Sequence, residues 1–161
     1  MLREFMFGIG RKGDTKESLY RKIRKIFDAN GIEYKADDSN YIFITPQMGD
    51  DLPITMIITV SDGTVEFRCR LAFDASEDNF QIIIDAINKL NAEIALGAFV
   101  VDPDNGWVMY RYSYIYIDVK PNADLILSLM KMAIDTVDAH DGALKALMPI
   151  KKDDRYTMMF V

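Results

Sequence analysis

The chain has 161 residues, of which 50% are hydrophobic and 11% aromatic, enough for one domain with a buried core. Its 25 acidic and 19 basic residues give a net charge of −6, the wrong sign for a protein that binds nucleic-acid phosphates. One cysteine, Cys69, and one histidine, His140, exclude an internal disulfide framework and a cysteine-rich zinc site. Because no apolar run approaches the ~20 residues that span a bilayer, we expect a soluble, cytoplasmic protein with neither nucleic-acid nor membrane partners.

The first half of the chain predicts one helix and four strands. Apolar residues at helical spacing indicate a helix over residues 15–30, with Asp14 and Glu17 as a capping-box-like start. Short β-type runs over residues 33–36 and 41–45 follow. Strands over residues 54–60 and 64–73 then flank Asp62-Gly63, a dipeptide typical of a two-residue hairpin turn.

The second half predicts a helix, a hairpin and a final helix. Ser76 is the expected cap of a helix that ends near Gly97, strands over residues 98–101 and 107–118 follow, and Asn122 is the expected cap of a helix that ends at Pro149. The resulting order, α-β-β-β-β-α-β-β-α, predicts an α+β fold in which helices pack on one face of an antiparallel sheet. We expect a flexible N-terminal tail over residues 1–14, one domain over 15–148 and a C-terminal tail over 149–161.

The two hairpins predict which residues the helices cover. A turn at Asp62-Gly63 pairs Met56 with Cys69, on an apolar face that also contains Val60, Val65, Ile58, Phe67, Ile54 and Leu71. Cys69 is therefore expected in the core, as a small apolar residue. A two-residue turn at Asn105-Gly106 pairs Val101 with Tyr110 and Phe99 with Tyr112, and places the tyrosines on the covered side.

The opposite, open face carries the residues that we expect to bind a partner. Arginine, methionine and aromatic residues are enriched at protein interfaces, and the predicted register gathers five of them there: Arg68, Arg70, Trp107, Met109 and Arg111. The alternative is that Glu66 and other carboxylates pair with the arginines on an ordinary solvated face.

Three further patterns superficially match ligand sites, but each favours a plain structural interpretation. The glycines of Gly8–Gly13 match a dinucleotide loop without the strand that must precede it, and the segment Asp102–Gly106 has its glycine one position too early for a calcium loop. Asp135, Asp138 and Asp141, with His140 beside them, are typical of the solvated face of a helix. No nucleophile elbow accompanies the histidine, so we expect no catalytic residues, no cofactor and no metal ligands.

The element order and several short motifs together resemble the YbjN family of bacterial proteins over residues 15–147. The motifs are Asn30-Gly31-Ile32 at the end of the first helix, Ile87-Asn88-Lys89-Leu90-Asn91 on the second, and Gly106 at the hairpin turn before Tyr110-Arg111. The resemblance implies the fold of type III secretion chaperones, a role in sensory-transduction regulation or chaperone-like binding, and dimerisation. It implies no catalytic residues. Asn88 and Asn91 are the only polar positions that match the family motif, and we expect them to have a structural role, with hydrogen bonds to the backbone near the helix end.

We therefore expect a non-enzymatic bacterial protein that binds a protein or peptide partner through its sheet face or edge, as a homodimer. The alternative is a small-ligand regulatory domain with a cavity between the sheet and the helices. An enzyme of unknown reaction ranks third.

Overall fold

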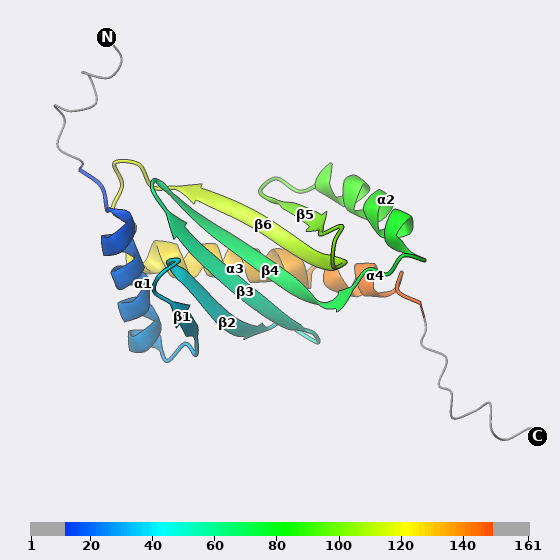
Figure 1. Ribbon diagram of the computed structural model, residues 1–161, viewed down its shortest axis with the longest axis horizontal. Helices are drawn as coiled ribbons and strands as arrows, with labels where there is room; N and C mark the ends of the chain where they lie inside the picture. Colours follow the sequence, from blue (N-terminus) through cyan, green and yellow to red (C-terminus); the bar gives the residue numbers. More distant parts are fainter. Residues whose placement is uncertain (1–11, 150–161) are drawn as a thin grey trace, which may run out of the picture.

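Alternating apolar residues build a six-stranded antiparallel sheet with the strand order β1-β2-β3-β4-β6-β5 (Figure 1). The computed structural model describes residues 12–149, so that Gly8, Gly10 and residues 150–161 of the expected C-terminal tail lie outside the described part. The elements in chain order are α1 (Lys16–Asn30), β1 (Lys35–Asp37), β2 (Ile42–Met48), β3 (Pro53–Ser61), β4 (Thr64–Asp74), α2 (Phe80–Asn91), β5 (Ala98–Val101), β6 (Trp107–Ile115), α3 (Ala123–Asp138) and α4 (Asp141–Lys145). The α+β class and the element order are those predicted, with a short α4 added where the last predicted helix breaks at Ala139 and His140.

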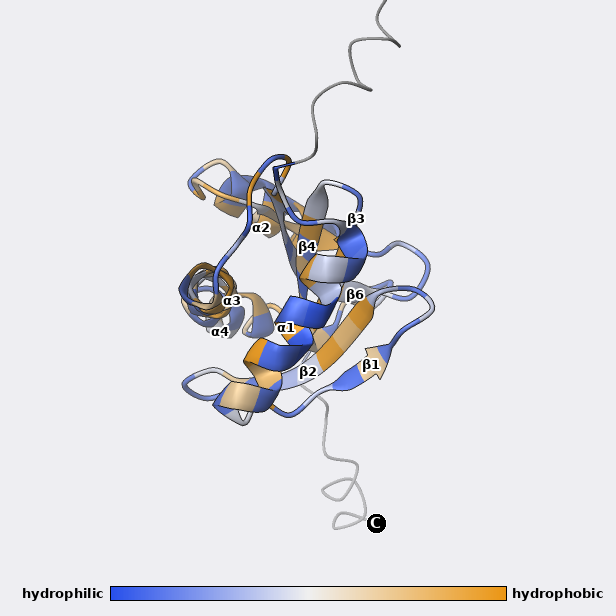
Figure 2. Ribbon diagram, turned by 90° about the vertical axis from the view of Figure 1, so that its left-hand side faces the viewer, coloured by the Kyte–Doolittle hydropathy of each residue, from blue (hydrophilic) through white to orange (hydrophobic). Residues whose placement is uncertain are grey.

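Within residues 12–149, the helices gather on one side of the sheet and leave its other face open. Helix α1 packs against β3, α3 packs against β4 and β6, and α2 flanks the edge strand β5. In Figure 2, α3 and α4 lie on the left and most of the strands on the right, and α1 alternates between hydrophilic and hydrophobic residues as an amphipathic helix does. None of the helices formed by residues 12–149 is long and apolar enough to cross a bilayer.

The β3–β4 hairpin has the predicted register and fixes the covered face. Gly63 turns the chain at φ +81°, a conformation that residues with a side chain rarely adopt. Met56 therefore pairs with Cys69, and Ile58 with Phe67. All four side chains are fully buried, and burial raises the pKa of the Cys69 thiol to about 12. The prediction that Cys69 is a buried core residue is confirmed.

The β5–β6 hairpin differs from the predicted register by two residues. Phe99 pairs with Tyr110, and Val101 pairs with Val108. The cause is a five-residue loop, Asp102–Gly106, closed by a hydrogen bond of 2.8 Å from the Gly106 N–H to the Asp102 carbonyl. Because the side-chain period of a strand is two, a shift of two residues leaves every side chain on its expected face.

Helix α1 begins one residue later than predicted. Its N-cap is Thr15, whose side chain accepts a hydrogen bond from the Ser18 N–H at 3.1 Å, while the Ser18 hydroxyl accepts one from the Thr15 N–H at 2.8 Å. This reciprocal pair is the capping box, so the expectation of Asp14 and Glu17 is wrong by one position. Asp14 instead forms an ion pair with Lys22.

The N-terminus of α2 is also corrected, whereas that of α3 is as predicted. Asn79 is the residue before α2, and its side-chain oxygen accepts hydrogen bonds from the N–H and the hydroxyl of Ser76 at 2.7 and 2.9 Å. Ser76 therefore stabilises the turn that precedes the helix and does not cap it. Asn122 caps α3, with its side-chain oxygen 2.8 Å from the Leu125 nitrogen.

Candidate functional site

The open face of the sheet brings the three predicted arginines together. Arg68 of β4 lies opposite Arg111 of β6 in the strand ladder, and on its other side it lies opposite Ile57 of β3. Ile57 in turn pairs with Ile44 of β2. Paired residues point to the same face of a sheet, so one row across four strands passes from aliphatic to cationic side chains.

The next row places the two apolar candidates beside the arginines. Arg70 lies opposite Met109, and its guanidinium carbon is 4.1 Å from the centre of the Trp107 ring. An arginine at this distance over an indole makes a favourable cation–π contact. The structure thus brings all five predicted partner-binding residues to one surface of β4 and β6.

Carboxylates also lie on this surface, as the alternative interpretation required. Glu66 pairs with two arginines, through Oε1 at 3.1 Å from Arg68 Nε and Oε2 at 2.5 Å from Arg111 Nη2. Arg70 pairs with Asp74 at 3.2 Å. Three arginines therefore face two carboxylates, and their side chains remain 32%, 34% and 51% exposed for Arg68, Arg70 and Arg111. The cluster keeps a positive charge in a chain of net charge −6.

Sequence reasoning missed part of the aliphatic half of this face. Ile44 and Met48 of β2 are 41% and 70% exposed, and both point away from the helices because they pair with Ile57 and Pro53 of β3. The sequence predicts this strand only as a short β-type run over residues 41–45, which does not reach Met48. The signal was the alternation with buried Phe43, which places Ile44 on the opposite face.

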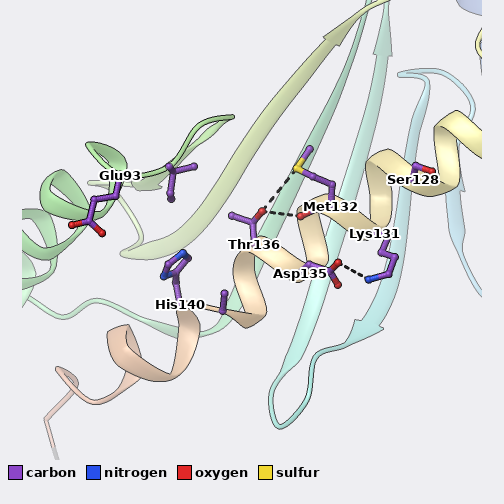
Figure 3. Close-up of a pocket in the computed structure, with 9 residues that line it drawn as sticks. Glu93, Ser128, Lys131, Met132, Asp135, Thr136 and His140 are labelled. Carbon is purple, nitrogen blue, oxygen red and sulfur yellow. Dashed lines mark hydrogen bonds and ion pairs between the residues drawn. The ribbon is translucent and has the colours of Figure 1, made fainter.

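A groove on the covered side separates the α2–β5 connection from α3. Its volume is about 680 Å³, and its lining residues are Glu93, Ile94, Ser128, Lys131, Met132, Asp135, Thr136, Ala139 and His140. Figure 3 shows Glu93 across the groove from Thr136 and His140. Thr136 donates a 2.8 Å hydrogen bond to the Met132 carbonyl, and Lys131 pairs with Asp135. Within residues 12–149 the side chains of Glu93, Ser128 and His140 make no hydrogen bond or ion pair, so these polar groups are free to contact a ligand.

The acidic pattern near the end of α3 is divided between two sites. Asp135 and His140 line the groove, and the His140 ring meets Phe99 edge-on at 6.0 Å. Asp138 and Asp141 face Asp51 instead. The expectation of a uniformly solvated acidic face is wrong at Asp141, which is 2% exposed. Burial raises the pKa of its carboxyl most, and the nearby carboxylates of Asp138 and Asp51 raise it further, whereas the Gly142 backbone N–H and Lys145 lower it.

The two asparagines of the α2 motif have different environments. Asn91 ends α2, and its amide both donates to the Phe99 carbonyl at 2.9 Å and accepts from the Phe99 N–H at 2.8 Å. These bonds tie the helix to β5. Asn88 is exposed, and no side-chain hydrogen bond links it to the rest of residues 12–149.

Within residues 12–149, helices cover one face of the antiparallel sheet and leave the other bare. This arrangement defines an α+β module, the class that the element order predicted. A sequence model of the YbjN family, described as "Putative bacterial sensory transduction regulator", matches residues 21–146. The chain therefore belongs to the YbjN family, which that description makes a family of regulators.

A solved structure shares the fold. The crystal structure described as "YbjN, a putative transcription regulator from E. coli" superposes with a TM-score of 0.63 at 13% sequence identity, over 74% of this chain and 86% of that one. At this identity the likeness shows the fold alone. A search of curated proteins found no match.

Proposed function

We propose that this protein is a non-enzymatic, cytoplasmic regulatory module that binds a polypeptide partner on its open sheet face. The observation that supports the proposal best is that β2, β3, β4 and β6 present one continuous surface, aliphatic at Ile44 and Ile57 and cationic at Arg68 and Arg111. No helix within residues 12–149 covers it. Exposed apolar area bordered by charge is typical of a binding surface.

The face is a better candidate than the sheet edges. At one edge, β1 has only three residues, and at the other β5 is flanked by α2. Short or covered edges resist the addition of a strand from another chain. We therefore place the partner on the face itself.

The chemistry of the face indicates what kind of segment fits. Side chains of Arg68, Arg70 and Arg111 attract carboxylates, and the indole of Trp107 and the thioether of Met109 offer apolar contacts. The remainder of this acidic protein repels an acidic partner segment, whereas the arginine cluster attracts it. The charge distribution therefore also orients the segment on the open face. We infer an acidic segment with interspersed aliphatic residues as the partner.

The test is site-directed photo-crosslinking in the native cell. A photoreactive residue in place of Met109 should crosslink one partner, whereas the same residue in place of exposed Ala143 on α4 should not. The triple variant Arg68→Glu, Arg70→Glu, Arg111→Glu should reduce the Met109 crosslink at least about tenfold, because a single arginine at the centre of an interface contributes ~2 kcal/mol or more. The circular dichroism spectrum should stay nearly unchanged.

Two further variants complete the design. Because Glu66 loses both arginine partners in the charge reversal, a neutral triple variant, Arg68→Gln, Arg70→Gln, Arg111→Gln, separates loss of recognition from loss of stability. Reversal of three exposed cations elsewhere, Arg21, Lys25 and Lys89, changes the net charge equally and should leave the crosslink intact. If the neutral variant crosslinks the partner at the wild-type level, or Ala143 crosslinks it equally, the open face is not the binding site.

The groove beside α3 favours a second candidate, a small-ligand sensory module. Its volume of about 680 Å³ lies within the usual range for ligand sites. Thermal unfolding in the presence of a panel of metabolites discriminates between a small-ligand module and a polypeptide-binding module. A ligand whose stabilising effect is lost in His140→Ala and Glu93→Ala, but kept in the arginine variants, would favour the groove.

A further inference from the structure

Three carboxylates from distant parts of the chain converge at one end of the sheet. Asp51 lies in the β2–β3 connection, Asp138 is the last residue of α3, and Asp141 is the first residue of α4. One carboxylate oxygen of each lies within 4.8 Å of those of the other two. Charges of one sign at this spacing repel each other, so a counter-charge would stabilise the arrangement.

Asp141 is the member that points to a bound ligand. The residue is only 2% exposed. Its Oδ1 atom is enclosed and accepts no hydrogen bond from any group in residues 12–149. An enclosed carboxylate oxygen without a partner is strongly destabilising, and here it belongs to a carboxylate that faces two others.

The backbone holds the loop in place without using the Asp51 carboxylate. The Asp50 N–H donates a 2.6 Å hydrogen bond to Asp138 Oδ1, and the Gly49 N–H donates to the Leu52 carbonyl at 3.0 Å. A β-carbon on Gly49 would lie 2.2 Å from Asp138 Oδ1, so a side chain at this position would displace the Asp138 carboxylate. Asp51 is exposed and is not committed to a hydrogen bond within the described chain.

The surroundings favour a cation. None of the ion pairs within residues 12–149 involves Asp51, Asp138 or Asp141. Lys145 of α4 lies close enough to lower the pKa of the Asp141 carboxyl, but it forms no ion pair with it. The last turn of α3 contains no basic residue, and the carbonyl end of a helix carries a partial negative charge. The sequence alone favours a solvated acidic face here and predicts no metal ligands.

We propose that Asp51, Asp138 and Asp141 bind a Ca²⁺ ion. Three carboxylates without a nitrogen or sulfur donor select a hard cation. Ca²⁺ accepts several carboxylates in a flexible geometry, whereas Mg²⁺ demands a near-ideal octahedron and is usually bound by only one or two carboxylates. Three carboxylates from separate segments of the chain therefore suit Ca²⁺ better. The ion joins the β2–β3 loop to the α3–α4 corner, and it does so independently of any partner on the open face.

Thermal unfolding of the full chain with CaCl2 or MgCl2, at matched ionic strength and after treatment with EDTA, tests the proposal. Millimolar Ca²⁺ should raise the midpoint, because an ion that binds only the folded state stabilises it. Mg²⁺ should raise it less. The absence of a Ca²⁺-dependent shift, or a larger shift with Mg²⁺, would overturn the assignment.

Two neighbouring acids provide matched variants. Asp51→Asn should weaken Ca²⁺ binding at least about tenfold, because even outer-shell partners of a metal site contribute that much. Asp50→Asn removes the same charge one residue away and should leave the shift unchanged, because the loop contact uses the Asp50 backbone. Equal effects of the two variants would indicate diffuse attraction to an acidic surface, and would overturn the site.

A third variant keeps the proposal distinct from simple protonation. Asp141→Asn should abolish the Ca²⁺-dependent shift while the protein stays folded. If Asp141 instead retains its proton in the native state and binds no ion, the variant again shows no shift, but the wild type should also unfold at the same temperature in Ca²⁺ and in EDTA. That result would exclude the ion.

Discussion

Cys69 lies in the middle of the covered face, between Met56 on β3 and Tyr110 on β6. Its thiol has a pKa of about 12, because burial disfavours the thiolate. We predict that the native thiol does not react with a maleimide near neutral pH and reacts quickly in denaturant, since the thiolate is the nucleophile. Fast reaction of the folded protein would contradict the burial.

The burial of Cys69 also predicts how substitutions at this position and alkaline pH change the free energy of unfolding. Cys69→Asp should lower the free energy of unfolding by several kcal/mol, on the order of the whole stability margin, whereas Cys69→Ala should cost only about 1 kcal/mol. Because the folded pKa is raised above the ordinary value of 9.0, stability should fall as the pH rises from about 9 towards 12. Denaturant titrations of the three proteins at several pH values measure both effects.

At the scale of the element, α2 is joined to β5 through one side chain. Asn91→Ala should lower the free energy of unfolding by about 1 to 3 kcal/mol, because two hydrogen bonds to the Phe99 backbone contribute about 0.5 to 1.5 kcal/mol each. Asn88→Ala makes the same chemical change on an exposed position three residues earlier and should stay within about 0.5 kcal/mol of the wild type. Urea unfolding of the two variants provides the comparison. Equal stabilities would show that the Asn91 amide is not what holds the helix to the strand.

Local signals predicted the elements, whereas contacts across the chain decided their details. The Asp62-Gly63 turn set the β3–β4 register because a two-residue turn leaves one way to pair the strands. The β5–β6 register was two residues away because five residues, not two, form the loop after Val101. The prediction that Arg111 lies on the open face was still correct, because a register shift of an even number of residues does not change the face of a side chain.

The candidate sites likewise divide into one that local signals predict and others that depend on contacts across the chain. The arginine cluster was predictable, since strand alternation assigns a face to each residue. The Asp51 cluster was not, because it depends on how the β2–β3 loop contacts the end of α3, which no periodicity in the sequence records. The groove depends likewise on the distance between the α2–β5 connection and α3.

At the scale of the whole molecule, the three main helices cover one face of six strands and leave apolar surface on the other. Met48 of β2 and Ile115 of β6 are 70% and 63% exposed, and Ile117, just beyond β6, is 66% exposed. Apolar area of this kind is often buried by a second copy. Together with the YbjN family resemblance, it is the basis on which we infer a homodimer.

Light scattering on the purified protein at tens of micromolar should therefore give a mass near twice 18.4 kDa. In a two-fold dimer centred on the arginine cluster, Arg68 and Arg111 would face their own copies, and the like charges would oppose association. We thus expect the copies to meet away from the arginines, and the variant Arg68→Gln, Arg70→Gln, Arg111→Gln to keep the dimeric mass while it loses the partner. A monomeric wild type would contradict the dimer. A dimeric wild type with a monomeric variant would instead place the second copy on the arginine cluster, where the polypeptide partner is proposed to bind.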